Sequence, residues 1–218
     1  MQIVPPGPFL GGTYRPAATV TPDGGFVDVV RVEDDGKLSS ALWRVPFLGG
    51  TPRRLLENIG SPVGWSPDGR SFAFVRGRGS ALVVADADGN HERVLAVGGK
   101  RAWEFLAFLT IPGNPHVPPA WSPDGRLIAM SGFRSVGGVL QPLFFFTSVA
   151  DGAVQAVPVP TGVTGLAWLD NSSLVLSGAQ EFGGLSHLWK LAYPSGELTR
   201  LTNDLSSYEG ISLTADRT

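Results

Sequence analysis

Acidic and amide side chains in two stretches of the chain have the chemistry to bind a divalent metal ion. Glu57 and Asn58 lie in the first stretch, and Asn203, Asp204 and Glu209 lie in the second. Carboxylate and amide oxygens are the ligands that Ca²⁺ prefers. A bound Ca²⁺ ion could polarise a carbonyl group or activate water, which is the chemistry of lactone and ester hydrolysis. The sequence therefore leaves Ca²⁺ open as a cofactor, with Glu57, Asn203, Asp204 and Glu209 as candidate ligands.

Side chains that suit acid–base or nucleophilic catalysis are few. The sequence contains no cysteine, no G-x-S-x-G elbow, no P-loop and no H-E-x-x-H motif. Its three histidines are His91, His116 and His187. The members of a Ser-His-Asp triad need not be adjacent in sequence, so the sequence neither supports nor removes such a triad. Whether the protein is an enzyme stays open on these grounds.

Two nearly identical motifs indicate that the chain is built from repeats. Trp-Ser-Pro-Asp-Gly-Arg occurs at residues 65–70 and again at 121–126, and each copy leads into an alternating apolar segment. Weaker copies begin at Val20, Trp168 and Leu213. The intervals fit the period of about 40–45 residues that is typical of a four-stranded propeller blade. The one longer interval contains an insertion at residues 98–116.

Residues aligned by the repeat form columns that suit a radial fold. Inner strands converge on the axis of a propeller, where only small side chains fit. A small residue precedes the first residue of every copy: Thr19, Gly64, Ala120, Ala167 and Ser212. One column in the following strand has an exception, because Asp28 stands where the other copies have Ala73, Ala129 and Val175.

Each copy predicts four strands. Pro-Asp-Gly between the first two strands is a tight hairpin turn, in which proline presets φ and glycine takes a positive φ. We expect third strands at residues 41–45, 81–85, 143–147 and 188–192. We expect outer strands to begin near Arg53, Arg93, Val154 and Leu198.

The repeat predicts an all-β protein, a partial or small β-propeller with four four-stranded antiparallel blades and the inner strand of a fifth. A single domain spans residues 1–218, with blades at about 13–56, 61–97, 117–160 and 164–203 and the start of a fifth at 208–218. Open blade edges present unpaired N–H and C=O groups. We therefore expect a ring sealed by residues 1–12 or, preferably, a homo-oligomer joined through the open edges.

The motif resembles the TolB-like, WD-repeat-like propeller repeat of bacteria. The residues that carry the resemblance are Trp-Ser-Pro-Asp-Gly-Arg, the segment 42–46 (Leu-Trp-Arg-Val-Pro) and the segment 198–203 (Leu-Thr-Arg-Leu-Thr-Asn). Similar repeats occur in TolB, in propellers appended to bacterial serine/threonine kinases and in the propellers of prolyl-oligopeptidase-type peptidases. The resemblance covers nearly the whole chain and implies a fold, because the shared residues are structural.

Composition and charge limit the classes of partner. Lys and Arg number 17 and Asp and Glu 19, for a net charge of −2, and no block of like charge occurs. We therefore expect no nucleic-acid partner and no membrane insertion. Residues 1–12 show no signal peptide. Together with the bacterial resemblance, this predicts a soluble protein of the bacterial cytoplasm or periplasm.

Propeller sites usually lie at one mouth of the central channel, on loops that lead into inner strands and loops that join second to third strands. Polar residues in these loops that do not repeat from blade to blade are the binding candidates. They are Tyr14, Arg15, Glu57, Asn58, Arg76, His116, Arg134, Glu181, Tyr208 and Glu209.

Two functions from different classes fit these observations. The first is a non-catalytic propeller that binds a protein or senses a small-molecule ligand at the channel mouth. The alternative is a Ca²⁺-dependent lactone or ester hydrolase with its site at the same mouth. Activity on lactones and esters with and without a chelator separates the two.

Overall fold

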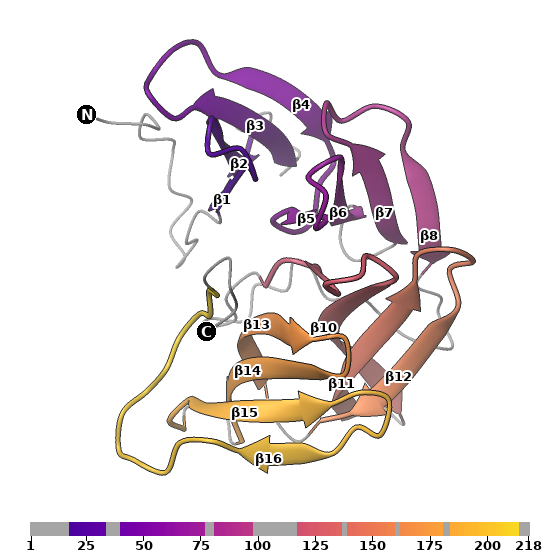
Figure 1. Cartoon of the computed structure of the whole chain (residues 1–218), viewed down its shortest axis with the longest axis vertical. Helices are drawn as coiled ribbons and strands as arrows, with labels where there is room; N and C mark the ends of the chain where they lie inside the picture. Colours follow the sequence, from indigo (N-terminus) through magenta and orange to yellow (C-terminus); the bar gives the residue numbers. More distant parts are fainter. Residues whose placement is uncertain are drawn as a thin grey trace.

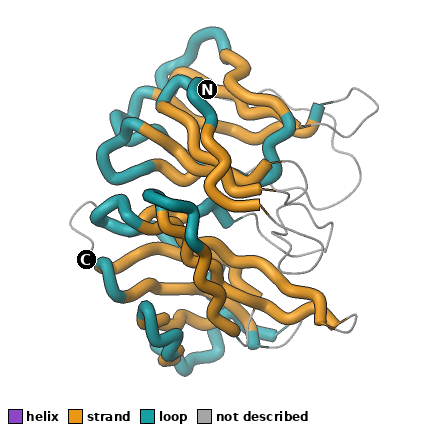
Figure 2. Tube along the Cα trace, turned by 90° about the vertical axis from the view of Figure 1, so that its right-hand side faces the viewer, coloured by secondary structure: helices purple, strands orange, loops and turns teal. Residues whose placement is uncertain are grey.

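The computed structural model describes residues 18–33, 40–76, 81–97, 117–136, 139–159, 162–180 and 184–213. Within these ranges the chain forms sixteen strands and no helix, in four separate four-stranded sheets. The sheets follow one another around a common axis from the indigo end of the chain to the gold end (Figure 1). Seen from the side, each sheet lies beside the next one along the chain (Figure 2).

Each sheet is one blade, and its strands pair in sequence order with antiparallel registers. Blade 1 contains β1 (Ala18–Val20), β2 (Phe26–Val32), β3 (Ser40–Pro46) and β4 (Arg53–Glu57). Blade 2 contains β5 (Gly64–Trp65), β6 (Ser71–Arg76), β7 (Ala81–Asp86) and β8 (Arg93–Val97).

Blade 3 contains β9 (Ala120–Trp121), β10 (Leu127–Val136), β11 (Val139–Ser148) and β12 (Val154–Pro158). Blade 4 contains β13 (Gly162–Asp170), β14 (Ser173–Ala179), β15 (His187–Ala192) and β16 (Leu198–Arg200). This confirms the predicted all-β propeller of four antiparallel blades. The four outer strands begin at the four residues expected from the sequence.

The hairpin turn between the first two strands is held by the motif's own side chains. In blade 2, Ser66 Oγ donates to Asp68 Oδ1 at 2.7 Å, and Ser66 Oγ accepts from the backbone N–H of Ser71 at 3.0 Å. Asp68 Oδ1 also accepts from Arg70 N, and Gly69 has a φ of +69°. The same bonds recur around Thr21 and Ser122 in blades 1 and 3. The recurring aspartates are therefore structural.

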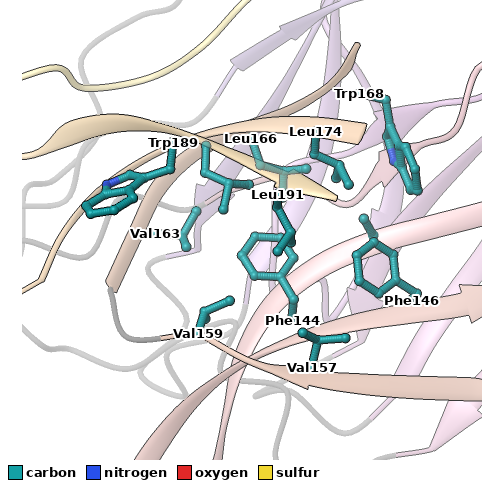
Figure 3. Packing of buried hydrophobic residues seen from close by; sticks show 12 residues of the cluster. Phe144, Phe146, Val157, Val159, Val163, Leu166, Trp168, Leu174, Trp189 and Leu191 are labelled. Atoms are coloured by element: carbon teal, nitrogen blue, oxygen red, sulfur yellow. The ribbon is translucent and has the colours of Figure 1, made fainter. Parts of the chain in front are cut away.

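The hydrophobic core lies between neighbouring blades, because each sheet buries a face against the sheet beside it. Between blades 3 and 4, Phe144 and Phe146 pack against Leu174, Trp168 and Leu191 (Figure 3). The Phe146 and Trp168 ring centres are 5.7 Å apart in an edge-on arrangement. Equivalent clusters lie between blades 2 and 3 and between blades 1 and 2.

In blades 3 and 4, the tryptophan that begins the motif links the blade to the one before it. Trp121 Nε1 donates to Gly64 O at 2.9 Å, and Trp168 Nε1 donates to Ala120 O at 3.0 Å. Trp65 Nε1 is buried without a partner. The matching places of Trp65, Trp121 and Trp168 in the repeat predict three equivalent buried indoles. Trp168 is buried, whereas Trp65 and Trp121 are half-buried.

Asp28, the exception in its column, has a structural explanation. It is buried and pairs across the strands with Arg44, whose Nε and Nη2 lie 2.7 and 2.9 Å from the two carboxylate oxygens. Arg44 Nη1 also donates to Ala87 O in blade 2, and its guanidinium lies 5.2 Å from the ring centre of Trp65. A buried ion pair therefore takes the place of apolar packing and ties blade 1 to blade 2.

Residues 208–213 follow the path of a fifth inner strand without forming a strand. The backbone of Gly210 and Ile211 lies against Gly165 of β13, so close that a Cβ on Gly165 would be 2.8 Å from Gly210 Cα. The chain before β9 approaches Gly64 of β5 in the same way. Residues 214–218 and the insertion at 98–116 lie outside the described residues.

Candidate loop-face site

The channel mouth proposed from the sequence corresponds to one end of the blades, here called the loop face. It consists of the loops that join second to third strands and the segments that lead from an outer strand to the next inner strand. The opposite end, with the short hairpin turns of each blade, is called the turn face. Residues 58–63, 184–186 and 201–207 are described parts of the loop face.

Several predicted site residues lie outside the described residues. Tyr14, Arg15, His116 and Glu181 are among them. Arg134 lies in β10, where only the backbone is described, opposite Gln141 of β11. The remaining candidates fall into two groups, one in blades 1 and 2 and one in blade 4.

The first group joins the end of blade 1 to blade 2. Arg76, at the end of β6, donates from Nη1 to the backbone oxygen of Glu57 at 2.7 Å and pairs with Glu92. Its guanidinium lies 4.8 Å from the ring centre of Phe74. Asn58 has a φ of +52° and turns the chain after β4. The structure thus brings Glu57, Asn58 and Arg76 together.

Hydrogen bonds also fix the backbone of this group. Gly60 N donates to Val75 O at 2.7 Å, and Val75 N donates to Ser61 Oγ at 2.9 Å. The Glu57 carboxylate accepts from Arg54 Nη1 at 2.8 Å. The segment after β4 is therefore bonded to the end of β6, which holds the neighbouring side chains in defined places.

The second group lies on blade 4, where residues 201–208 fold along the loop before β15. Tyr208 N donates to Ser186 O at 2.8 Å, and Ser186 N donates to Ser207 Oγ at 3.2 Å. Asp204 accepts from Tyr208 Oη at 2.6 Å and from Ser206 N at 2.9 Å. The structure therefore places Asp204 and Tyr208 in direct contact.

Electrostatics in this second group follow from those contacts. The hydrogen bond from Tyr208 and the one from Ser206 N lower the pKa of Asp204 below its usual value, with smaller contributions from His187 and Arg200. The same bond to Asp204 raises the pKa of Tyr208. Arg200 Nη2 lies 2.8 Å from His187 Nε2. An acid, a phenol and two basic side chains thus share one region.

The candidate metal ligands do not form a common set among the described residues. No three His, Asp or Glu side chains lie close enough there to hold an ion. Both Asp204 oxygens accept hydrogen bonds from its own loop, and the Glu57 carboxylate is bonded to Arg54. Asn203 and Glu209 are exposed on the segment that follows β16. The geometry is that of hydrogen-bonded loops.

Sequence reasoning missed the residues that hold these loops in place. Glu92 pairs with Arg76, Ser186 and Ser207 link two loops of blade 4, and Arg200 lies beside His187. Arg200 stands opposite Trp189 in the β15–β16 ladder. Only the cross-strand register could have indicated that Arg200 lies opposite Trp189, because the two residues belong to different strands.

The fold and the loop face define a β-propeller with WD-repeat-like blades. More narrowly, the chain has the TolB-like propeller fold. It aligns with TolB from Acinetobacter baumannii at 18% identity and a TM-score of 0.61, over 88% of this chain and 45% of that one. It aligns with a putative TolB from Agrobacterium tumefaciens at 22% identity and a TM-score of 0.55, over 83% and 62%.

Other comparisons add further similar proteins and define no narrower class of protein. The structure of puromycin hydrolase aligns at 19% identity and a TM-score of 0.57, over 84% of this chain and 28% of that one. Uncharacterized protein Atu1656 of Agrobacterium fabrum is 32% identical over 119 residues, which are 53% of this chain and 35% of that protein. The chain thus spans less than half of the TolB chain from Acinetobacter and of this relative. No protein-family model matches it.

The described residues include no helix long and apolar enough to cross a membrane.

Proposed function

We propose that this propeller is a binding module that recognises a protein or a small-molecule ligand at its loop face. The supporting observation is that the loop segments there are hydrogen-bonded to one another and to the blades. Arg76 to Glu57 O and Tyr208 N to Ser186 O are such bonds. Loops fixed on a rigid scaffold present polar groups in defined places, which reduces the entropy that binding must remove.

The chemistry of the two groups suits recognition of polar ligands. Arg76 and Arg200 supply planar cations, Asp204 supplies a carboxylate with a lowered pKa, and Tyr208 supplies an aromatic ring. The aromatic and arginine side chains are of the types that contribute most at protein interfaces. The structures of TolB and puromycin hydrolase align with this propeller fold.

A ligand screen by thermal shift tests the proposal. A panel of peptides, sugars, lactones and esters is added to the purified chain, and a binder raises Tm because it stabilises the folded state alone. The double variant Asp204→Ala/Tyr208→Phe should lose that shift. The control Arg53→Ala removes an exposed cation on the turn face, next to Asp88, and should keep it.

Turnover assays on the same lactones and esters decide between binding and hydrolysis. Binding without turnover supports the module. Turnover that disappears in EDTA would replace it with the Ca²⁺-dependent hydrolase. A ligand whose shift survives in the loop-face variant and is lost in Arg53→Ala would place the site on the turn face, against the proposal.

A further inference from the structure

A repeated contact on the turn face joins each blade to the next. The turn between the third and fourth strands of a blade accepts a hydrogen bond from a side chain of the preceding blade. Arg44 donates to Ala87 O at 2.7 Å, Arg93 to Val149 O at 2.9 Å, and Gln155 to Pro194 O at 3.2 Å. The same polar contact therefore occurs at all three junctions between the four blades.

A close contact with the outer strand of the preceding blade accompanies each of these hydrogen bonds. Gly89, Gly152 and Gly196 lie in the three accepting turns with φ between 72° and 82°. Gly89 lies against Leu55 and Leu56, Gly152 against the backbone carbonyl of Leu95, and Gly196 against the side chain of Val157. Leu56, Leu95 and Val157 are all buried. We call the hydrogen bond and the covered apolar residue together the turn joint.

The donating half of a turn joint is exposed on blade 4. Leu201 N donates to Leu188 O, so Leu201 lies opposite Leu188 in blade 4. The corresponding pair in blade 3 is Val157 opposite Phe144. Leu201 thus has the position of the covered residue, yet it is 49% exposed, whereas Val157 is 8% exposed. Lys190, opposite Val175, has the position of Arg44 opposite Asp28 and is also exposed.

The accepting half is exposed on blade 1. Its turn between β3 and β4 contains Phe47 and Leu48, which are 45% and 88% exposed, followed by Gly49 and Gly50 with positive φ. Phe47 N donates to Gly25 O, so the turn is held against the first hairpin turn of the blade, beside exposed Phe26. An apolar surface of this kind is uncommon on a monomer and marks an interaction site.

We propose that blade 4 of one copy of this chain docks under the residue 47–50 turn of a second copy, forming a fourth turn joint. Lys190 would donate to the carbonyl of Phe47, and Leu201 would be covered by Phe47 and Leu48. Both halves belong to the same chain and match a contact that the fold already uses three times. If a two-fold axis relates the two copies, blade 4 of each copy meets the blade 1 turn of the other, and the dimer contains two equivalent joints.

The joint uses the outer part of the blades alone. On blade 1, Val27, Val29 and Val45 of the inner part are already buried. On blade 4, Gly210 and Ile211 already lie against the inner strand. Phe47, Leu48 and Leu201 of the outer part are exposed. This second copy contacts blade 4 through Lys190 and Leu201, and it is a partner distinct from a ligand that Asp204 and Tyr208 bind at the loop face.

Light scattering after size-exclusion chromatography tests the proposal on the full 218-residue chain. The expected mass at high concentration is twice the 23.0 kDa of one chain. Leu201→Asp and Leu48→Asp should each return the mass to that of one chain, because a carboxylate would be buried in the joint. The control Leu205→Asp alters a leucine that is 91% exposed on the loop face and should leave the mass doubled. Circular dichroism verifies that each variant is folded.

A monomer at every concentration of the unmodified chain overturns the proposal and leaves the edge to another blade or partner. A dimer that both variants retain overturns it as well.

Discussion

At the scale of single residues, the repeat is a set of short side-chain bonds that make one turn. Ser66 and Asp68 use their oxygens to bind each other and the backbone of residues 70 and 71. Thr21 with Asp23 and Ser122 with Asp124 repeat this pattern. Serine or threonine two residues before aspartate therefore holds this turn in blades 1, 2 and 3, which explains why the motif recurs without any shared ligand.

These turns predict how stability responds to acid. Asp68 and Asp124 each accept one hydrogen bond from a serine hydroxyl and one from a backbone N–H. These bonds hold the pKa of both carboxyl groups below the usual value. A group with a lower pKa in the folded state stabilises the fold above its unfolded pKa of about 3.9 and loses that contribution as pH falls through the folded value. The free energy of unfolding should thus decrease as pH falls below about 4.

Removing two of the carboxylates tests that explanation. Urea unfolding of Asp68→Asn/Asp124→Asn between pH 7 and pH 2.5 should give a shallower loss of stability in acid than the unmodified chain. The neutral amide cannot take up the proton, and its oxygen can still accept a hydrogen bond. Equal acid slopes for the two proteins would contradict the assignment of stability to these turns.

At the scale of elements, the sequence predicted the strands well because the repeat aligns four independent copies. Outer strands begin at Arg53, Arg93, Val154 and Leu198, and each follows a turn with a recognisable glycine. The register between strands was less accessible. Asp28 was identified as the exception in its column, yet its partner Arg44 became evident only once β2 and β3 were paired.

The Asp28–Arg44 pair makes a quantitative prediction about blade 1. Blade 2 has Ala73 opposite Val84 at the same place. Asp28→Ala alone should lower the free energy of unfolding by about 3–5 kcal/mol, because it leaves a buried guanidinium without its counter-ion. Asp28→Ala/Arg44→Val recreates the blade 2 pair and should recover most of that loss.

Urea unfolding of the single and double variants measures this coupling. Arg54→Ala is the control, since it breaks the exposed Arg54–Glu57 pair and should cost no more than about 1 kcal/mol. A double variant as unstable as the sum of its single variants would show that the ion pair and its apolar replacement are not interchangeable.

At the scale of the whole molecule, the sequence predicted a region for the candidate site and no set of contacts. The rule that propeller loops carry function selected Glu57, Arg76 and Tyr208, and the structure places Glu57 beside Arg76 and Tyr208 beside Asp204. The residues that hold them, such as Ser207 and Glu92, gave no signal in the sequence. The contacts of these residues depend on how the loops fold against the blades.

The packing of blades around the axis explains why small residues precede each motif. Gly64 of β5 lies against the chain just before β9, and a Cβ at Gly64 would overlap the carbonyl oxygen of Pro119. The Gly64 carbonyl also accepts the indole hydrogen of Trp121. Blades 2 and 3 therefore meet through backbone at this point, and no rotamer change could relieve an added methyl group.

Gly64→Ala should consequently destabilise the protein, although Gly64 has no positive φ that would itself disfavour alanine. Forcing extra atoms into a packed site costs about 1–3 kcal/mol, and the cost here should lie at the upper end because the obstacle is backbone. Gly162→Ala is the matched control, since a Cβ there meets no atom within 4 Å. The free energy of unfolding, measured in urea, should fall for Gly64→Ala and change by no more than about 0.5 kcal/mol for Gly162→Ala. If the two variants unfold at the same urea concentration, the inner strands are not packed as tightly as the small residues before each motif imply.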